Sequence, residues 1–596
     1  MSTPATAIDP PVPEAAPRRP AWWPGIVLAA LVTALTTGWG LTRDPLEPYY
    51  AASVRAMASN WHAFFFGAFD PAATVTMDKL PGAFWVQALL VRALGPAPWV
   101  MVAPQVVEMT AAVVVLALAV RALAGPAAGT VAAVVLALSP AAVAVGRGNV
   151  ADPLMILALV AATWATARAL SSARAVGWLA LAGVFVGLAF QAKMAAAWLV
   201  LPALAVAFLV AGPGTWPRRI GATAAAGAVT AVVSLAWTVA VSAVPAAARP
   251  WVDGSTDDSL WQQTFVYNGL GRLGAQNPLQ VLAGQGLALT APGTDSGPSW
   301  DRLVVGALAR SAGWLLPAAV LAVVVGLWTL RRAPRTDLRR AAYLLFGLWL
   351  VVYGLAFSAG AVVNVYYVAS LAPAVAGVLG VAFVHVRAAR GTAGARVATA
   401  LAVVVTVAYG AVLVLHSERP LITPVVLAVV LGLVSAGLVA TARRGAFVVG
   451  LVAVLVLPVA ATAWLLALGG GAFDTPLETA REVRAVRVLL VAAPRVAAAT
   501  LPGLEHVRGG APDLMAVQSS AVASVFAYPT GEEVLPIGGF TGTGPSPTLD
   551  QLRADVAAGR FHVVLSFPGM DPRLVWVDQH CRALPSKDPT FRVHEC

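Results

Sequence analysis

The sequence predicts a polytopic α-helical membrane protein with a small α/β domain at its C-terminus. Of the 596 residues, 59% are hydrophobic and only 11% are charged, whereas a water-soluble protein carries about 25% charged residues. Apolar runs of about 18 or more residues recur along the chain, and each can cross about 30 Å of hydrocarbon. After residue 470 the chain changes to short runs such as L-M-A-V-Q, E-V-L-P-I-G-G and F-H-V-V-L-S-F. Such runs are typical of an α/β domain.

The first 22 residues predict a disordered cytoplasmic tail, because residues 1–20 hold six prolines and cannot build a core. Arg18 and Arg19 hold this tail inside, so the loop that follows the first span lies outside. The net charge of +11 does not indicate nucleic-acid binding. Most basic residues stand in short clusters between apolar runs, which is typical of cytoplasmic membrane loops.

About 13 spans are predicted in a membrane domain over residues 23–468. They are 24–41, 98–120, 127–145, 152–170, 176–192, 195–211, 220–242, 303–330, 341–360, 366–386, 397–415, 421–440 and 446–468. The apolar segment 80–95 is short and flanked by prolines, so it predicts an interfacial helix. With that choice the basic clusters fall inside, and the long loops 42–97 and 243–302 fall outside.

The C-terminal domain, residues 470–596, follows an odd number of spans and is therefore expected outside. Cys581 and Cys596 are the only cysteines. In an oxidising compartment they are expected to pair. No cysteine or histidine cluster indicates a structural zinc site.

The loop from Arg43 to Pro81 is the strongest candidate for a reaction centre. An outside site has no access to cytoplasmic nucleotides, so a transferase there needs a donor that arrives through the membrane, such as a lipid-linked phosphate. A carboxylate of Asp44, Glu47 or Asp78 could take the proton of an acceptor hydroxyl. Cations could hold the departing phosphate, and aromatic rings could stack on a sugar. The candidate substrate-binding residues are Lys79, Tyr50, Arg55, Arg147, Asn149, Asp152, Lys193, Tyr267, Asn268, Arg272, Tyr366 and Tyr367.

Several of these residues have a simpler interpretation. Asp152 precedes Pro153 at the start of a span and could be a helix cap. Lys193 is harder to dismiss, because a charge at membrane depth usually faces a cavity or pairs. A divalent metal is possible: the acidic residues of the second loop could bind one weakly, although a solvated role is favoured for them. They are Asp253, Asp257 and Asp258.

The pattern E-P-Y-Y-A-A-S-V-R-A-M followed by D-K-L-P-G-A-F-W resembles the first loop of the GT-C glycosyltransferases, specifically the protein O-mannosyltransferase and aminoarabinose transferase superfamily. The chain also resembles a bacterial mannosyltransferase branch marked by W-H-A-F-F-F-G-A-F-D-P, R-G-N-x-x-D, R-P-W-V-x-x-S-T-D, Y-N-G-L-G-R and an outside domain with I-G-G-F-T-G-T. The resemblance covers most of residues 40–380 and parts of 515–596.

The resemblance assigns roles to several residues. Glu47 matches the glutamate of the family's acidic pair, but Leu46 stands where the catalytic aspartate is expected. The base therefore stays open, with Glu47 and Asp78 ranked ahead of Asp44. Lys79 matches a lysine near the lipid phosphate. Asp152 matches an acidic residue that enters the active site. The family's histidine-proline reads Asn364-Val365 here, before Tyr366 and Tyr367.

The resemblance implies a GT-C fold and an inverting transfer of a mannose-like hexose from a polyprenyl-phosphate donor to an acceptor hydroxyl. The acceptor could be a protein, a lipid or a cell-wall glycan, at the outer face of a bacterial plasma membrane. A transporter or flippase of lipid-linked sugars is the main alternative, and a sensor or scaffold that binds wall polymers is another. A transporter would need charges near the bilayer midplane and paired half-helices, and the sequence shows neither clearly.

Overall fold

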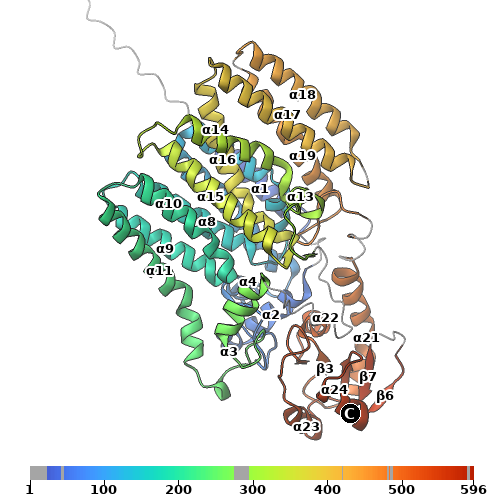
Figure 1. Ribbon diagram of the computed structural model, residues 1–596. Coiled ribbons are helices and arrows are strands. Elements are labelled where there is room, and N and C mark those ends of the chain that lie inside the picture. Colours follow the sequence, from blue (N-terminus) through green and yellow to red (C-terminus); the bar gives the residue numbers. More distant parts are fainter. Residues whose placement is uncertain are drawn as a thin grey trace, which may run out of the picture.

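The computed structural model describes residues 23–41, 46–273, 294–418, 420–443, 445–479, 482, 487–586 and 591–596. Figure 1 shows a bundle of long helices with a small sheet domain at one end, and α2 to α4 lie between the two. The bundle contains α1 Trp23–Gly38, α5 Pro98–Ala124, α6 Pro126–Ala137, α7 Pro140–Val145, α8 Asp152–Ala169, α9 Ala175–Lys193, α10 Leu201–Ala211, α11 Trp216–Ser242, α13 Gly306–Ala312, α14 Leu316–Thr329, α15 Leu338–Ala359, α16 Ala372–Ala388, α17 Ala393–Leu415, α18 Ile422–Ala440 and α19 Ala446–Ala467.

Nine helical segments in the described part of the chain are long and apolar enough to cross a membrane. One of them, Ala175–Ala211, contains two of the predicted spans. Met194, at φ +49°, ends α9. Lys193 then lies beside the start of α8, whereas Gly212 after α10 accepts a hydrogen bond from Arg335 at the opposite end of the bundle. The helices α9 and α10 therefore each run from one end of the bundle to the other.

The remaining predicted spans correspond to α1, to α6 with α7, and to α8. The predicted span 127–145 is divided between α6 and α7, because the helix breaks at Leu138 and Ser139. Pro140 lacks an N–H group and disfavours helical geometry at Ser139, whose backbone is extended at φ −75° and ψ 121°. The break leaves the chain after α7 free to turn toward α8.

The interfacial helix predicted near 80–95 is α4, Gly82–Leu94. Near its start, Trp85 Nε1 donates to the carbonyl of Phe64 at 2.7 Å. Near its end, Arg92 Nη1 donates to the carbonyl of Ala58 at 3.2 Å. Both ends thus lie against α2 (Pro48–Ser59) and α3 (Trp61–Phe66), so α4 stays at one end of the bundle. We call this end, which also carries the sheet domain, the site face.

Helix packing is close where small residues meet. Gly380 of α16 lies against the carbonyl of Ala128 in α6, where an added Cβ would come within 2.5 Å of the oxygen. Small residues let helix backbones approach in this way inside membranes, where lipid removes most of the hydrophobic drive between helices.

The C-terminal domain contains a five-stranded sheet of order β4-β3-β5-β7-β6. Strands β3, β4 and β5 are parallel, and β7 pairs antiparallel with β5 and β6. Its elements are α21 Ala493–Arg508, β3 Met515–Gln518, α22 Ser520–Thr530, β4 Val534–Ile537, α23 Leu549–Ala557, β5 Val563–Ser566, α24 Pro572–His580, β6 Arg582–Leu584 and β7 Arg592–Glu595. The carboxyl ends of the parallel strands meet at one edge, and the loop after β4 leaves the sheet there.

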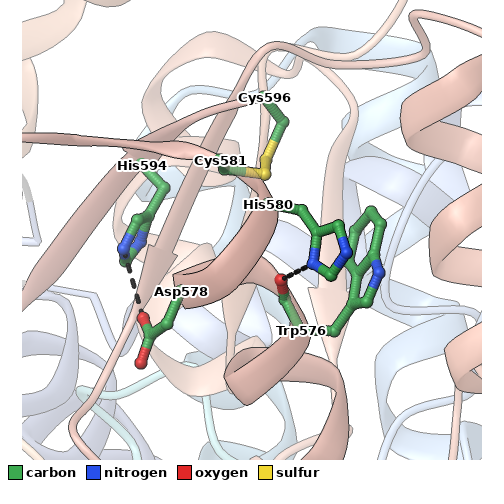
Figure 2. Close-up of a disulfide and its surroundings, with 6 residues drawn as sticks. All are labelled: Trp576, Asp578, His580, Cys581, His594 and Cys596. Carbon is green, nitrogen blue, oxygen red and sulfur yellow. Dashed lines mark hydrogen bonds and ion pairs between the residues drawn. A yellow bond between two sulfur atoms is a disulfide. The ribbon is translucent and has the colours of Figure 1, made fainter.

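Cys581 and Cys596 form a disulfide that joins the end of α24 to the end of β7. Figure 2 shows His580 and His594 on either side of it. His580 Nδ1 lies 2.9 Å from the carbonyl oxygen of Trp576, and His594 Nε2 lies 3.1 Å from Asp578 Oδ1. The bridge ties the end of the last strand to the end of α24.

Candidate active site

A cavity of about 460 Å³ lies at the site face. It gathers charged and polar side chains from separate parts of the chain: Tyr50, Lys79, Asp152, Lys193, Asn268, Arg272, Tyr353, Tyr366 and Tyr367. The rest of the lining is mostly apolar and includes Met155, Trp198, Leu199, Phe265, Leu270, Phe357 and Val363. One part of the cavity therefore suits an anion, and another part suits a hydrocarbon chain.

Lys79 lies in the loop between α3 and α4. Its Nζ donates to the hydroxyl of Tyr50 at 2.7 Å and lies 3.1 Å from Asp78 Oδ1. Burial lowers the pKa of Lys79, but the charge of Asp78 and the nearby tyrosines outweigh it and hold the pKa above its ordinary value. Lys79 is therefore a permanent cation at the cavity wall.

Lys193 and Asp152 form a second ion pair, between the end of α9 and the start of α8. Asp152 does not cap α8, since Ala151 occupies the cap position and Asp152 is the first helical residue. Lys193 Nζ also lies over the rings of Tyr366 and Tyr367, 4.7 and 4.0 Å from their centres. Such contacts favour a desolvated cation.

Arg272 brings a third cation from the second long loop. Its guanidinium lies 5.2 Å from the ring centre of Tyr267, and its Nη2 donates to Asn268 Oδ1 at 3.4 Å. Asn268 Nδ2 in turn donates to the carbonyl of Asp78 at 2.6 Å, and the hydroxyl of Tyr267 lies 3.5 Å from Asp78 Oδ2. The second loop is thus fastened to the first at the residue beside Lys79.

Glu47 caps α2, where its Oε2 accepts the N–H of Tyr50 at 2.7 Å and Pro48 is the first helical residue. Asn149 holds the Glu47 backbone from both sides: its Oδ1 accepts the Glu47 N–H at 2.9 Å, and its Nδ2 donates to the Glu47 carbonyl at 3.0 Å. Burial raises the pKa of Glu47 to about 7, although the N–H groups of Tyr50 and Tyr49 and the charge of Lys79 lower it in part. Such a carboxyl can change protonation near neutral pH.

Four of the predicted substrate-binding residues do not line this cavity: Arg55, Arg147, Asn149 and Tyr267. The candidate bases Glu47 and Asp78 do not line it either, although each contacts a residue that does. Arg55 donates to the carbonyls of Pro529 and Thr530 at 3.1 and 3.2 Å, and so holds the end of α22. Arg147 is 1% exposed and donates to the carbonyls of Gly470, Thr36 and Trp39 at 2.8, 2.9 and 2.6 Å. Asp44 lies outside the described residues.

Replacing Arg147 by alanine is expected to destabilise the fold by about 3 kcal/mol, because three carbonyls from two separate segments lose a charged donor. The measurement is thermal unfolding of the detergent-purified protein. Arg331→Ala is the matched control, because Arg331 is exposed and donates to the carbonyl of Trp328 in the preceding helix. Equal melting temperatures for both variants would contradict this role for Arg147.

Three further residues support the site: Tyr49, Gln263 and Asp253, of which Gln263 lies in none of the sequence motifs described above. Tyr49 is 1% exposed and accepts the N–H of Asp78 at 2.7 Å with its hydroxyl. Gln263 Nε2 donates to the carbonyls of Met77 and Asp253, both at 2.8 Å. Burial and the charge of Asp78 raise the pKa of Asp253 to about 7, although the N–H groups of Phe540 and Gly254 lower it in part. Buried polar contacts of this kind follow from tertiary packing, not from local pattern.

Two of the three acidic residues considered for a metal, Asp253 and Asp258, have other partners. Asp253 accepts the N–H groups of Gly254 and Phe540, and Asp258 pairs with Arg249 at 2.8 Å. Within the ranges that the structure describes, no three His, Cys, Asp or Glu side chains gather as a metal site would require. A second cavity of about 550 Å³ lies between α14, α16, α17 and α19, and its lining contains no Asp, Glu, Lys or Arg. It offers no comparable set of charged groups.

Comparison with known families gives two matches. Residues 78–238 match the family described as "Dolichyl-phosphate-mannose-protein mannosyltransferase". Residues 502–580 match the family described as "Putative mannosyltransferase YkcB-like, C-terminal".

Two curated relatives come from Bacillus subtilis (strain 168): "Putative mannosyltransferase YkcB", 34% identical over 253 residues, and "Putative mannosyltransferase YycA", 33% identical over 252. Each alignment covers 42% of this chain, and 35% and 37% of the relatives respectively. The chain thus spans little more than a third of the length of the curated relatives it matches.

Solved structures share the fold over most of the chain. ArnT from Cupriavidus metallidurans, bound to undecaprenyl phosphate, superposes with a TM-score of 0.57 at 16% identity, over 96% of this chain and 97% of that one. An Archaeoglobus fulgidus oligosaccharyltransferase tethered to an acceptor peptide gives a TM-score of 0.51 at 13% identity, over 92% and 69%. At these identities the likeness shows the fold. This chain therefore shares its fold with these two proteins, and two segments of its sequence match mannosyltransferase families.

Proposed function

We propose that this protein transfers a hexose from a polyprenyl-phosphate donor to an acceptor hydroxyl, with inversion, at the outer face of a bacterial plasma membrane. One observation carries the proposal: Lys79, Lys193 and Arg272 converge on one cavity whose remaining wall is mostly apolar and aromatic. Phosphate oxygens need several cations in a site that excludes water. A prenyl chain needs the apolar wall.

The bond changes follow from this arrangement. The acceptor oxygen attacks the anomeric carbon, the bond from that carbon to the phosphate oxygen breaks, and polyprenyl phosphate leaves with the electron pair. Lys79 and Arg272 neutralise the charge that builds on the leaving phosphate. A carboxylate takes the acceptor proton, and Glu47 is the stronger candidate, since a base works best with a pKa near the working pH.

Asp78 fits a supporting role. Its side chain is only 3% exposed and its charge is compensated by Lys79. Asp152 has a buried oxygen, Oδ2, that accepts no hydrogen bond from the described residues, and Asp152 lines the cavity. We infer that this oxygen accepts a hydroxyl of the donor sugar, beside the ion-paired Lys193.

Several features support the orientation. The basic clusters lie at the end of the bundle opposite the site face, where Arg335 contacts the carbonyl of Gly212 and Asp337 caps α15. Such clusters favour the cytoplasmic side, which puts the cavity and the disulfide-bearing domain outside. The description of the family that matches residues 78–238 and the undecaprenyl phosphate bound to ArnT agree with a lipid-linked donor.

The test is incubation of the purified protein with polyprenyl-phosphate sugars. Release of polyprenyl phosphate that depends on acceptor and on the protein supports the transferase. Movement of intact donor across proteoliposomes with no release would favour a flippase and refute the proposal. Anomeric analysis of the product tests inversion separately.

A further inference from the structure

The C-terminal domain contacts residues next to the candidate site through the loop 538–544, G-G-F-T-G-T-G. We call this loop the docking loop. The N–H of Phe540 donates to Asp253 Oδ2 at 2.7 Å. Gly539 has φ +62°, and a Cβ there would lie 2.2 Å from Asp253 Oδ1. Only glycine permits this approach. The ring of Phe540 meets the ring of Tyr49 edge to face, with centres 4.8 Å apart.

The contact continues toward the cavity. The hydroxyl of Tyr49 accepts the N–H of Asp78 at 2.7 Å, and Asp78 pairs with Lys79 on the cavity wall. Tyr49 is 1% exposed and fixed between Phe540 and Phe69, whose ring lies 5.4 Å away in a stacked arrangement. A shift of the Phe540 ring would therefore leave a gap on one face of the residue that holds the Asp78 backbone.

The docking loop is itself held on the sheet. Ser519 Oγ donates to the carbonyl of Phe540 at 2.7 Å, and the N–H of Ser520 donates to the carbonyl of Gly539 at 2.8 Å. Gln518 Nε2 donates to the carbonyl of Gly542 at 3.3 Å. These partners lie at the last residue of β3 or directly after it, so the sheet holds the loop in one conformation.

We propose that the C-terminal domain is part of the reaction centre, and that Phe540 and Asp253 are positioning residues that fix Tyr49 and thereby the Asp78–Lys79 pair. The effect on turnover rests on the proposed transfer reaction, whereas the structural coupling does not. Other contacts keep the domain in place if the loop is altered. Arg55 holds the end of α22, and Glu533 Oε2 accepts the N–H of Ala72 at 2.8 Å.

The first test does not need activity. Amide hydrogen exchange at Asp78 is measured in the full-length protein and in Phe540→Ala. We expect at least about tenfold faster exchange at Asp78, because local opening becomes easier when Tyr49 loses its packing partner. Phe591→Ala is the control, since it removes a ring of the same domain that packs on Phe567, 5.2 Å away. Unchanged exchange in Phe540→Ala, or equal acceleration in both variants, would overturn the coupling.

The second test measures turnover. Phe540→Ala is expected to lower kcat by about 10- to 100-fold with donor KM nearly unchanged, the scale of a misplacement of about 1 Å. Phe540→Tyr keeps the ring and should restore most of kcat. Tyr49→Ala combined with Phe540→Ala should lose no more than Tyr49→Ala alone. Additive losses, or full kcat in Phe540→Ala, would refute the positioning role. An inactive wild-type protein would instead refute the transferase proposal, and the exchange result would still decide the coupling.

Discussion

Replacing Glu47 by glutamine is expected to lower kcat by about 10³-fold while the protein stays folded. A general base contributes about 10²- to 10⁴-fold, and glutamine cannot take a proton. Its side-chain carbonyl can still accept the N–H of Tyr50, so the cap on α2 survives. The measurement is single-turnover release of polyprenyl phosphate, with donor binding measured beside it. Asp78→Asn is the comparison, since it tests the other carboxylate.

The pH dependence provides a second readout for the same residue. A base must be ionised to act, and burial raises the pKa of Glu47 to about 7. Activity should therefore rise with pH through about 7 and level off above it. The charge of Asp78 raises the pKa of Glu47, so Asp78→Asn should move this rise to lower pH. If Glu47→Gln keeps the wild-type rate and profile, Glu47 is not the base.

Much of the architecture could be predicted from sequence because the bilayer imposes a simple rule on length and polarity. The apolar runs predict the long helices, and the prolines around residues 80–95 predict that α4 is short and separate from them. The break between α6 and α7 was missed because hydropathy averages over Ser139 and Pro140. The hydropathy of a run of apolar residues does not show where the helix lacks a backbone hydrogen bond.

The residues of the site also divide into those that the sequence identified and those that it could not. Lys193 was identified because a charge at membrane depth needs a partner, and the structure gives it Asp152. Arg147 was a candidate as the cation of the R-G-N-x-x-D motif, yet it binds carbonyls of separate segments. The sequence shows that a buried cation needs acceptors, but not whether those acceptors belong to a ligand or to the backbone. Tyr49 and Phe540 were missed because their contact joins residues almost 500 positions apart.

Replacing Lys79 by glutamine is expected to lower kcat/KM for the donor by about 10²- to 10³-fold, the cost of removing one group that stabilises developing charge. Lys79 is the cation that lines the cavity and pairs with Asp78 at 3.1 Å. Its loss has a second consequence, because it leaves the Asp78 carboxylate buried without its cation. A single substitution therefore mixes lost phosphate binding with lost stability.

The double variant Lys79→Gln/Asp78→Asn separates these effects. Removing both charges relieves the buried carboxylate, so the melting temperature should return close to that of the wild type. Donor affinity should stay low, because the cavity still lacks one of its three cations. Arg92→Gln is the control for a general loss of positive charge, since Arg92 is an exposed residue of α4. If the double variant regains donor affinity along with stability, Lys79 serves only to neutralise Asp78, and the phosphate must be held by Lys193 and Arg272.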